Sequence, residues 1–279
     1  MNRSISVAGI DRCRQDYWNE AAETYEQDFA VTLIGRLQRS AVWRDLDRVF
    51  HPPQRILELN CGTGIDAVHL CKRGLQVVAC DISPRMIDLA IQRAQSAGCS
   101  ERLGFHTLAT EEIGALAGEG PFDGVFSNFS GLNCVEDLTA VRRSLSPLIN
   151  PGSPMLLCML GRFVPWEIAW FMAHGNWNAA SRRVRRSKAG CVPKTSVKVH
   201  YPSVSEIARA FAPDFTMRRW RGVGLTLPPS YLEHWAQRFS RLTSVLAGID
   251  HLIGDLPVLR NMANFAVLEF ERMRPGENL

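Results

Sequence analysis

Long apolar runs are absent from this 279-residue sequence. The most apolar insert, "FVPWEIAWFMA", contains Glu167 and is too short to cross a bilayer, which takes about 20 apolar residues in a helix. The first residues, "MNRSISVAGIDRCRQDYWNE", lack the apolar core of a signal peptide. We therefore expect a cytoplasmic protein without a transmembrane segment.

Paired redox cysteines and zinc-binding clusters are also absent. The eight cysteines form no C-x-x-C pair, and no group of Cys and His has the spacing of zinc ligands. Several cysteines lie in apolar segments, where a free Cys behaves as a small hydrophobic residue. The pattern predicts reduced, buried thiols and no metal site.

A strong charge imbalance is missing too. The net charge of +4 is too small to indicate a nucleic-acid partner by itself. One run, "SRRVRRSK" (181–188), is much more basic than the rest. No internal repeat and no low-complexity tract is found. We expect no nucleic-acid ligand.

What the sequence does contain is a regular alternation of strand-like and helix-like segments. Ser83 followed by Pro84 is a good helix start, because a hydroxyl caps the helix and proline suits its first position. The alternation predicts an α/β fold with a mostly parallel sheet and right-handed crossovers. The expected strands are 55–59, 76–80, 103–108, 122–127 and 154–160, and the expected helices are 16–29, 31–50, 64–73, 84–97 and 136–148.

The alternation breaks after residue 160. A helix at 203–211 and strands at 215–221 and 264–271 would complete a seven-stranded sheet. We interpret 161–200 and 225–260 as inserts over the strand ends, where open α/β sheets bind ligands. The predicted parts are N-terminal helices covering the site (1–50), a cofactor-binding core (51–160), a cap insert (161–200), and the rest of the core with a helical insert at 225–260 (201–279).

The segment "RILELNCGTGID" (55–66) predicts a strand followed by a cofactor-binding turn. Read from Gly62, its spacing fits the dinucleotide fingerprint, with Asp81 about 20 residues on. Read from Asn60, it fits the turn of S-adenosylmethionine enzymes. Glu58 favours the second reading, because a carboxylate repels a diphosphate but attracts a sulfonium and an ammonium. Asp81 suits both readings, since both cofactors carry a ribose whose hydroxyls a carboxylate accepts.

Four segments then appear in a characteristic order: "RILELNCGTG", "VVACDISPRMIDLA", "FDGVFSNFSGLN" and "LSPLINPGSPMLLCM". Together they resemble the class I S-adenosylmethionine-dependent methyltransferases, of the type found in ubiquinone and menaquinone biosynthesis. The resemblance covers roughly residues 16–160, and it implies a Rossmann-like sheet with helices on both faces. It also implies S-adenosyl-L-methionine as cofactor.

The resemblance assigns residues to the cofactor and the substrate. It places Asn133 near the substrate. The residues implied at the cofactor are Tyr25, Glu58, Asn60, Gly62, Asp81, Ile82, Met86, Thr110, Glu111 and Asn128.

Two positions depart from the family pattern. Asn60 stands where glycine is usual, and asparagine tolerates a positive φ better than most residues. Ala109 stands where the family often has aspartate, and Glu111 is the candidate substitute.

Methyl transfer depends mainly on proximity and alignment, and it needs a general base only if the nucleophile must lose a proton. His200 and Tyr201, ahead of the helix expected at 203–211, are our first candidates for that role. Trp166 and Trp170 predict a wall for a flat or apolar substrate. Four arginines of the same insert are candidates to hold an anionic group, an acidic carrier or a membrane surface: Arg182, Arg183, Arg185 and Arg186.

The favoured function is therefore methyl transfer to an O, N or C centre of a small, apolar or aromatic metabolite. The alternatives are an RNA methyltransferase, a non-methylating catalyst or binder on the same fold, and a nicotinamide-dependent reductase. Peripheral membrane contact and the oligomeric state stay open.

Overall fold

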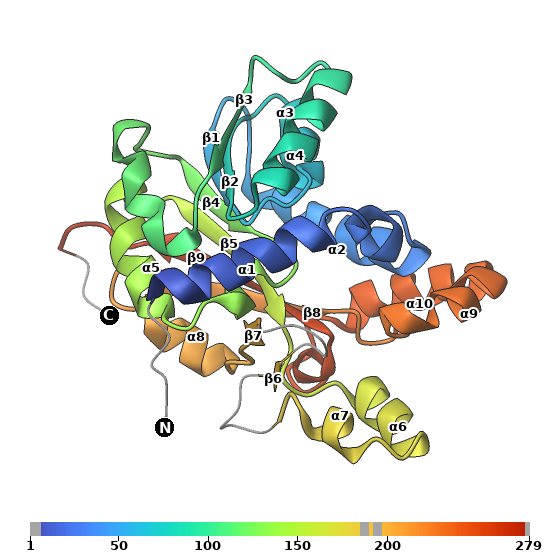
Figure 1. Cartoon of the computed structure of the whole chain (residues 1–279). Helices are drawn as coiled ribbons and strands as arrows, with labels where there is room; N and C mark the ends of the chain where they lie inside the picture. The colour runs from blue at the N-terminus through green and yellow to red at the C-terminus, as the bar shows by residue number, and fades with distance from the viewer. Residues whose placement is uncertain (1–6, 185–189, 192–196, 277–279) are drawn as a thin grey trace.

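The computed structural model describes residues 7–184, 190–191 and 197–276. A seven-stranded sheet forms the centre, with strand order β3-β2-β1-β4-β5-β9-β8 (Figure 1). The first five strands run parallel, and β9 and β8 are antiparallel to their neighbours. The predicted α/β fold is confirmed. The strands of the sheet are β1 (Arg55–Leu59), β2 (Gln76–Asp81), β3 (Leu103–Thr107), β4 (Gly124–Ser127), β5 (Pro154–Leu160), β8 (Phe215–Val223) and β9 (Phe265–Arg272).

Helices follow the strands on both faces of the sheet. Ser83 caps α4 as expected, accepting the amide of Met86 at 3.1 Å. The helices of the core are α2 (Leu33–Val49), α3 (Ile65–Lys72), α4 (Pro84–Ser96), α5 (Leu138–Leu145) and α8 (Val204–Phe211), with 3₁₀ segments η2 (Thr110–Gly118), η3 (Gly131–Cys134) and η4 (Ser146–Leu148).

The N-terminal region differs from the expected pair of helices. The first helix, α1, begins at Val7 and ends at Ala21, and a short π-helix, η1, follows at Glu26–Ala30. The helix predicted over 16–29 is therefore interrupted between residues 22 and 25. In Figure 1, α1 crosses in front of the sheet, over the ends of its strands.

The inserts contribute short elements outside the sheet. Residues 161–200 form α6 (Pro165–Ala173), α7 (Trp177–Ser181) and two paired two-residue strands, β6 (Gly190–Cys191) and β7 (Lys198–Val199). Residues 225–260 supply η5 (Ser230–Leu232), α9 (Glu233–Arg238) and α10 (Ser240–Ile253), and η6 (Leu259–Met262) follows. The division of the chain into domains stays a prediction.

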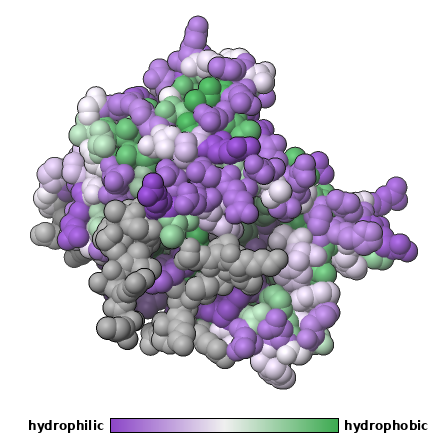
Figure 2. All heavy atoms as spheres, in the orientation of Figure 1, coloured by the Kyte–Doolittle hydropathy of each residue, from purple (hydrophilic) through white to green (hydrophobic). Residues whose placement is uncertain are grey.

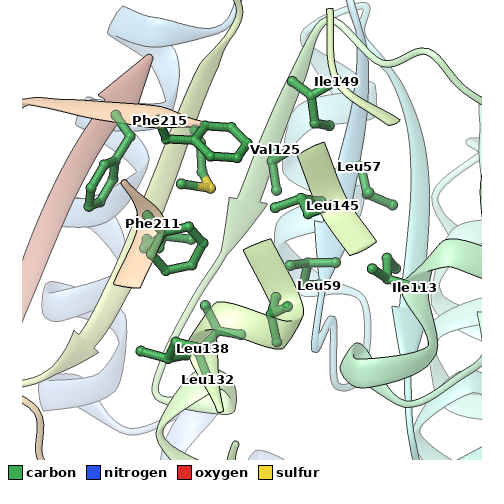
Figure 3. Packing of buried hydrophobic residues seen from close by; sticks show 14 of the residues in the cluster. Leu57, Leu59, Ile113, Val125, Leu132, Leu138, Leu145, Ile149, Phe211 and Phe215 are labelled. Carbon is green, nitrogen blue, oxygen red and sulfur yellow. The ribbon is translucent and has the colours of Figure 1, made fainter. Parts of the chain in front are cut away.

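Two apolar cores lie on opposite faces of the sheet because side chains alternate along each strand. Leu57 and Leu59 of β1 point to one face, together with Phe211 of α8 and Phe215 of β8 (Figure 3). Ile56, between the two leucines, points to the other face, which α2, α3 and α4 cover. This packing fixes the carboxyl ends of β1, β2 and β4 at one edge.

The surface seen in Figure 2 is mostly hydrophilic, with apolar residues in smaller areas between the polar ones. Within the described residues, no helix combines the length and the apolar character that a bilayer crossing requires. Nor do three His, Cys, Asp or Glu side chains of the described segments gather as a metal site would need.

Candidate cofactor site and neighbouring aromatic cavity

The turn after β1 has the backbone that its residues predict. Asn60, Gly62 and Gly64 all adopt positive φ, at 55°, 52° and 72°. A Cβ on Gly64 would lie 2.8 Å from the Cβ of Ala90, so glycine is what allows α3 to start against α4. Asparagine thus keeps the left-handed conformation that glycine usually supplies here.

The side chain of Asn60, which follows β1, forms hydrogen bonds with residues at the ends of β3 and β4. Its Nδ2 donates to Oγ1 of Thr110 at 2.9 Å, and its Oδ1 accepts from Oγ of Ser127 at 3.4 Å. Gly131 leaves the room for this side chain, because a Cβ there would lie 2.2 Å from the Cβ of Asn60.

Asp81 ends β2 with its carboxylate held against the turn. Its Oδ2 accepts from the amide of Gly62 and its Oδ1 from the amide of Ser83, each at 2.9 Å. Burial raises the pKa of Asp81, and these two backbone N–H groups oppose the shift. Each carboxylate oxygen has a second lone pair, so the residue can still accept two hydroxyls.

A cavity opens above this turn and gathers nine of the ten residues predicted at the cofactor. We call it the polar cavity, after the Arg14, Asp81 and Glu111 side chains in its wall. The tenth, Glu58, does not line it. The lining residues are Arg14, Trp18, Tyr25, Asn60, Gly62, Asp81, Ile82, Met86, Thr110, Glu111, Asn128, Phe129, Gly131, Cys134 and Val135.

Glu58 lies beneath the turn and is only 1% exposed. It is therefore not a solvent-facing acid at the strand end. Burial and the nearby Asp66 raise its pKa well above the ordinary value, although Arg39 opposes the shift. Its Oε2 has no hydrogen-bond partner among the described residues. In such a poorly hydrated site, a cation brought close to Glu58 would strongly favour the ionised form of its carboxyl.

The N-terminal helix α1 forms one wall of the polar cavity. Arg14 donates to Oε1 of Glu111 at 2.8 Å and to the carbonyl of Cys134 at 3.1 Å. Gln15 donates to the carbonyl of Ile82 at 3.0 Å. Sequence reasoning missed Arg14 and the neighbouring Trp18 as site residues. For Trp18, the helical spacing with Tyr25 was a signal in the sequence that could have indicated a place at the site. For Arg14, the sequence offered no such signal.

A buried polar network supports the other side of the turn. Asp66 accepts from Arg39 at 2.5 Å, from Trp43 at 2.6 Å and from Asn128 at 2.9 Å. Burial raises the pKa of Tyr25, while the neighbouring Arg39 opposes the shift. A small second cavity adjoins the polar one and is lined by Asp66, Arg39, Asn128 and Tyr25, but not by Trp43. The network joins α2 and α3 to the end of β4 and holds the amide of Asn128 in one orientation.

A third cavity, which we call the aromatic cavity, shares a wall with the polar cavity. The shared residues are Trp18, Tyr25, Phe129 and Cys134. Phe129 makes edge-to-face contacts with Phe29 and Phe265, at centroid distances of 4.9 and 5.2 Å. The complete lining is Tyr17, Trp18, Tyr25, Phe29, Phe129, Ser130, Cys134, Leu160, Val197, Val199 and Phe265.

Comparison with known proteins shows which kind of domain carries this cavity. A family model described as a methyltransferase domain matches residues 56–152, which carry most of the polar cavity. Residues 56–152 therefore form a methyltransferase domain of the class I S-adenosylmethionine-dependent type. The resemblance seen in the sequence and its implied cofactor, S-adenosyl-L-methionine, are thereby confirmed.

Two curated relatives illustrate the range within this family. The chain is 32% identical over 144 residues to the tRNA 5-carboxymethoxyuridine methyltransferase of Escherichia coli strain K12, covering 50% of this chain and 54% of that protein. It is 31% identical over 174 residues to a ubiquinone biosynthesis O-methyltransferase of Methylocella silvestris, covering 56% and 63%. The chain spans about half the length of the first curated relatives it matches.

A solved structure shows the same methyltransferase fold. The magnesium protoporphyrin IX methyltransferase from Synechocystis PCC 6803, with bound S-adenosylhomocysteine, superposes with a TM-score of 0.58. The match covers 94% of this chain and 99% of that one at 14% identity, so it is evidence for the fold alone.

Asn133, expected near the substrate, has a different environment. It is fully buried, its Nδ2 donates to the carbonyl of His200 at 2.7 Å, and its Oδ1 accepts from the amide of Leu160 at 2.9 Å. The amide is thus engaged with main chain at both ends. We assign it to holding the segment around residue 200 against β5, and not to contacting substrate.

The two candidates for a general base lie outside both cavities. His200 is half-buried, and burial lowers its pKa, although Glu136 opposes the shift. The ring of Tyr201 lies under the guanidinium of Arg183 at 5.5 Å, and burial raises its pKa. The structure does not bring either residue to the wall shared by the polar and aromatic cavities.

The tryptophans predicted to face the substrate also lie elsewhere. Trp166 is 53% exposed, and Trp170 packs against Tyr231 with ring centroids 5.7 Å apart. Neither lines the polar or the aromatic cavity. An aromatic wall does exist in the structure, but α1, η1 and the strand ends supply it.

Two arginines of the same insert, Arg182 and Arg183, pair with Glu167. Arg183 is 9% exposed and donates to Glu167 at 2.6 and 3.1 Å, and Arg182 donates to it at 3.0 Å. Arg183 is therefore not exposed to hold an anionic group, because its guanidinium is buried against the Glu167 carboxylate. Arg185 and Arg186 lie outside the described residues.

Proposed function

We propose that this chain transfers a methyl group from S-adenosylmethionine to a small, flat, apolar or aromatic metabolite in the aromatic cavity. One observation carries the proposal: a polar cavity at the family's cofactor turn and an aromatic cavity share Trp18, Tyr25, Phe129 and Cys134 as a common wall. Bound S-adenosylmethionine would supply a methyl group on a cationic sulfonium, and a nucleophile that attacks this methyl carbon in line would displace neutral S-adenosylhomocysteine.

The residues of the polar cavity fit this cofactor better than a dinucleotide. Asp81, at the end of β2, lines the cavity, so a diphosphate would meet its carboxylate. Glu58 of β1 lies beneath the turn with a raised pKa, and a cationic group brought close would favour its ionisation. Asp81 remains able to accept ribose hydroxyls, and Ile82 and Met86 offer an apolar face for an adenine ring.

The aromatic cavity orients a substrate but supplies no strong base. Among the described residues that line it, none is a histidine or a carboxylate. Burial raises the pKa of Cys134 to about 11, and it also raises the pKa of Tyr17, so both stay protonated at neutral pH. We therefore propose a nucleophile that needs no protein base: a carbon, a neutral amine or an oxygen ionised on its own. The chain's part is proximity, alignment and exclusion of water.

Transfer of the labelled methyl group of S-adenosylmethionine to hydroxylated and amino-substituted aromatic compounds tests this proposal. Val199→Trp fills the aromatic cavity from β7, so it should abolish transfer while leaving the affinity for S-adenosylhomocysteine unchanged. Val184→Trp, an exposed position that lines neither cavity, is the matched control. If the two variants lose transfer equally, or neither loses it, the substrate binds elsewhere.

A tRNA nucleobase is the second candidate substrate, and the 32% identity to the Escherichia coli tRNA methyltransferase favours it. A nucleobase is flat and stacks on aromatic side chains once it is out of the helix. The earlier expectation of no nucleic-acid partner is therefore not kept. Transfer to bulk tRNA in the same assay, sensitive to Val199→Trp, would select this substrate. Tight cofactor binding without transfer to either class would point to the non-methylating alternative.

A further inference from the structure

Helix α10 exposes a row of apolar side chains that has no cover within the described chain. Leu242, Val245, Ile249 and Leu252 are 47%, 59%, 41% and 77% exposed. Their spacing of three, four and three residues is that of the a and d positions of a coiled coil. We call these four residues the α10 stripe.

The helix is firmly attached along its other face, so the stripe is not a product of loose packing. α9 and α10 both pack against α2, and Thr243 and Asp250 are buried. Asp250 accepts the amides of Gly224, Leu225 and Thr226 at 2.5–2.8 Å. The helix therefore has a fixed inner face and a separate apolar outer one.

Other exposed apolar side chains lie before and after α10 in the sequence. Trp235 of α9 and Phe239, which joins α9 to α10, are 37% and 44% exposed, with ring centroids 5.3 Å apart. Leu256 and Val258, just past α10, are 48% and 69% exposed. Large apolar side chains exposed in one row on a helix are typical of a protein–protein contact. In Figure 1, α9 and α10 project to the right, away from the sheet.

We propose that the α10 stripe is the interface with a second copy of this chain, packed as an antiparallel pair of α10 helices about a two-fold axis. Antiparallel packing places an a residue of one helix opposite a d residue of the other. Leu242 then meets Leu252 of the second copy, and Val245 meets Ile249 of the second copy. Both layers repeat by symmetry, as an isologous contact requires.

The charges and the small residue beside the stripe suit the same arrangement. Arg241 precedes the stripe, and Asp255 follows it two residues past the end of α10. The exposed carboxylate of Asp255 accepts from Arg219 of its own chain at 2.6 and 3.3 Å, and antiparallel pairing brings Arg241 of the second copy toward the same carboxylate. Gly248 lies halfway between them, and a Cβ there would meet nothing within 4 Å. It falls at the two-fold axis, where the absence of a side chain lets the helices approach.

The same surface does not fit a membrane. Amphipathic helices that lie on anionic bilayers carry many Lys and Arg on the polar face. From α9 to Asp255, the only Lys or Arg residues are Arg238 and Arg241, against Glu233 and Asp255. Asp250 is buried on the inner face of α10 and does not contribute to this surface. A surface with balanced charges and a narrow heptad row fits a helix of the same kind.

Sedimentation velocity of the full chain between 1 and 100 µM tests this assignment. The parent should sediment as a dimer. Val245→Glu should raise the dimer dissociation constant at least about a hundredfold, because the buried charge occurs twice in a two-fold interface. Trp177→Glu, at an equally exposed apolar position on α7, should leave the dimer intact. Circular dichroism and melting temperature should match the parent in both variants, since both side chains are exposed.

A charge swap distinguishes self-pairing from any other cause of association. Arg241→Asp and Asp255→Arg should each weaken the dimer, and the double variant should restore it to within about threefold, because the two charges meet across the axis. Asp255→Asn in the same series measures how much of the loss comes from the pair that Asp255 forms with Arg219 of its own chain. A parent that is monomeric at 100 µM would overturn the proposal. So would a dimer that Val245→Glu leaves unchanged, or binding of the monomer to anionic vesicles that this variant abolishes.

Discussion

Gly131→Ala should destabilise the protein through one side chain, and Asn60→Gly should remove that effect. The added Cβ would lie 2.2, 2.4 and 2.6 Å from the Cβ, Cγ and Oδ1 of Asn60, which are its three nearest atoms. The φ of Gly131 is not positive, so alanine meets no backbone strain there. The change therefore probes how closely the β4 end packs on the cofactor turn.

The magnitudes follow from three contributions. Overpacking by one methyl group in a tight site costs about 1–3 kcal/mol, which is our expectation for Gly131→Ala. Asn60→Gly loses the hydrogen bond to Thr110, worth about 0.5–1.5 kcal/mol, but relieves a non-glycine residue of a left-handed conformation that costs about 1–2 kcal/mol. The single change at Asn60 should thus be nearly neutral. The double variant should then resemble Asn60→Gly, giving a coupling of about 1–3 kcal/mol.

Urea unfolding of the parent, the two single variants and the double variant measures this coupling. Gly114→Ala is the control, since a Cβ there meets nothing within 4 Å. Calorimetry with S-adenosylhomocysteine on the same proteins should show that Asn60→Gly keeps the affinity within about tenfold. Additive free energies of unfolding would refute the contact between Asn60 and Gly131. An affinity loss well above tenfold would show that the asparagine amide is itself a ligand.

Asp81→Ala should weaken binding of S-adenosylhomocysteine by removing charge-assisted hydrogen bonds of about 1.5–3 kcal/mol each, and an unchanged calorimetric affinity would place the ribose elsewhere. Glu58→Gln should stabilise the cofactor-free protein at pH 8, because the native pKa of Glu58 is raised and ionisation there opposes folding. That gain should vanish as the pH falls to about 4.5, and urea midpoints that shift equally at both pH values would contradict it. Glu167→Ala should cost about 3–5 kcal/mol in unfolding free energy by leaving Arg183 buried without its partner, with cofactor affinity unchanged; a loss below 1 kcal/mol would show that the pair is dispensable.

Much of the core and of the cofactor cavity could be predicted from the sequence because the signals are local. Buried parallel strands are short apolar runs, and Gly62, Gly64 and Asn60 mark the turn that follows β1. Asp81 and Met86 sit at a fixed distance along the chain from that turn. Nine predicted residues therefore meet at one cavity.

The substrate side could not be predicted because it depends on which face of each insert helix turns inward. By composition, α6 is an aromatic segment with a single acid, and the tryptophans were expected to face a ligand. In the structure Glu167 is the buried residue, drawn in by Arg183, and Trp166 is turned to solvent. The aromatic cavity instead joins α1, η1 and the ends of β5 and β9, which are far apart in sequence.

Calorimetric titration of the full chain with S-adenosylhomocysteine and, separately, with NADH tests the central claim most directly. The account predicts one site per chain for S-adenosylhomocysteine at micromolar affinity, about −8 kcal/mol, and no saturable heat with NADH. Saturable binding of NADH without any binding of S-adenosylhomocysteine would contradict it.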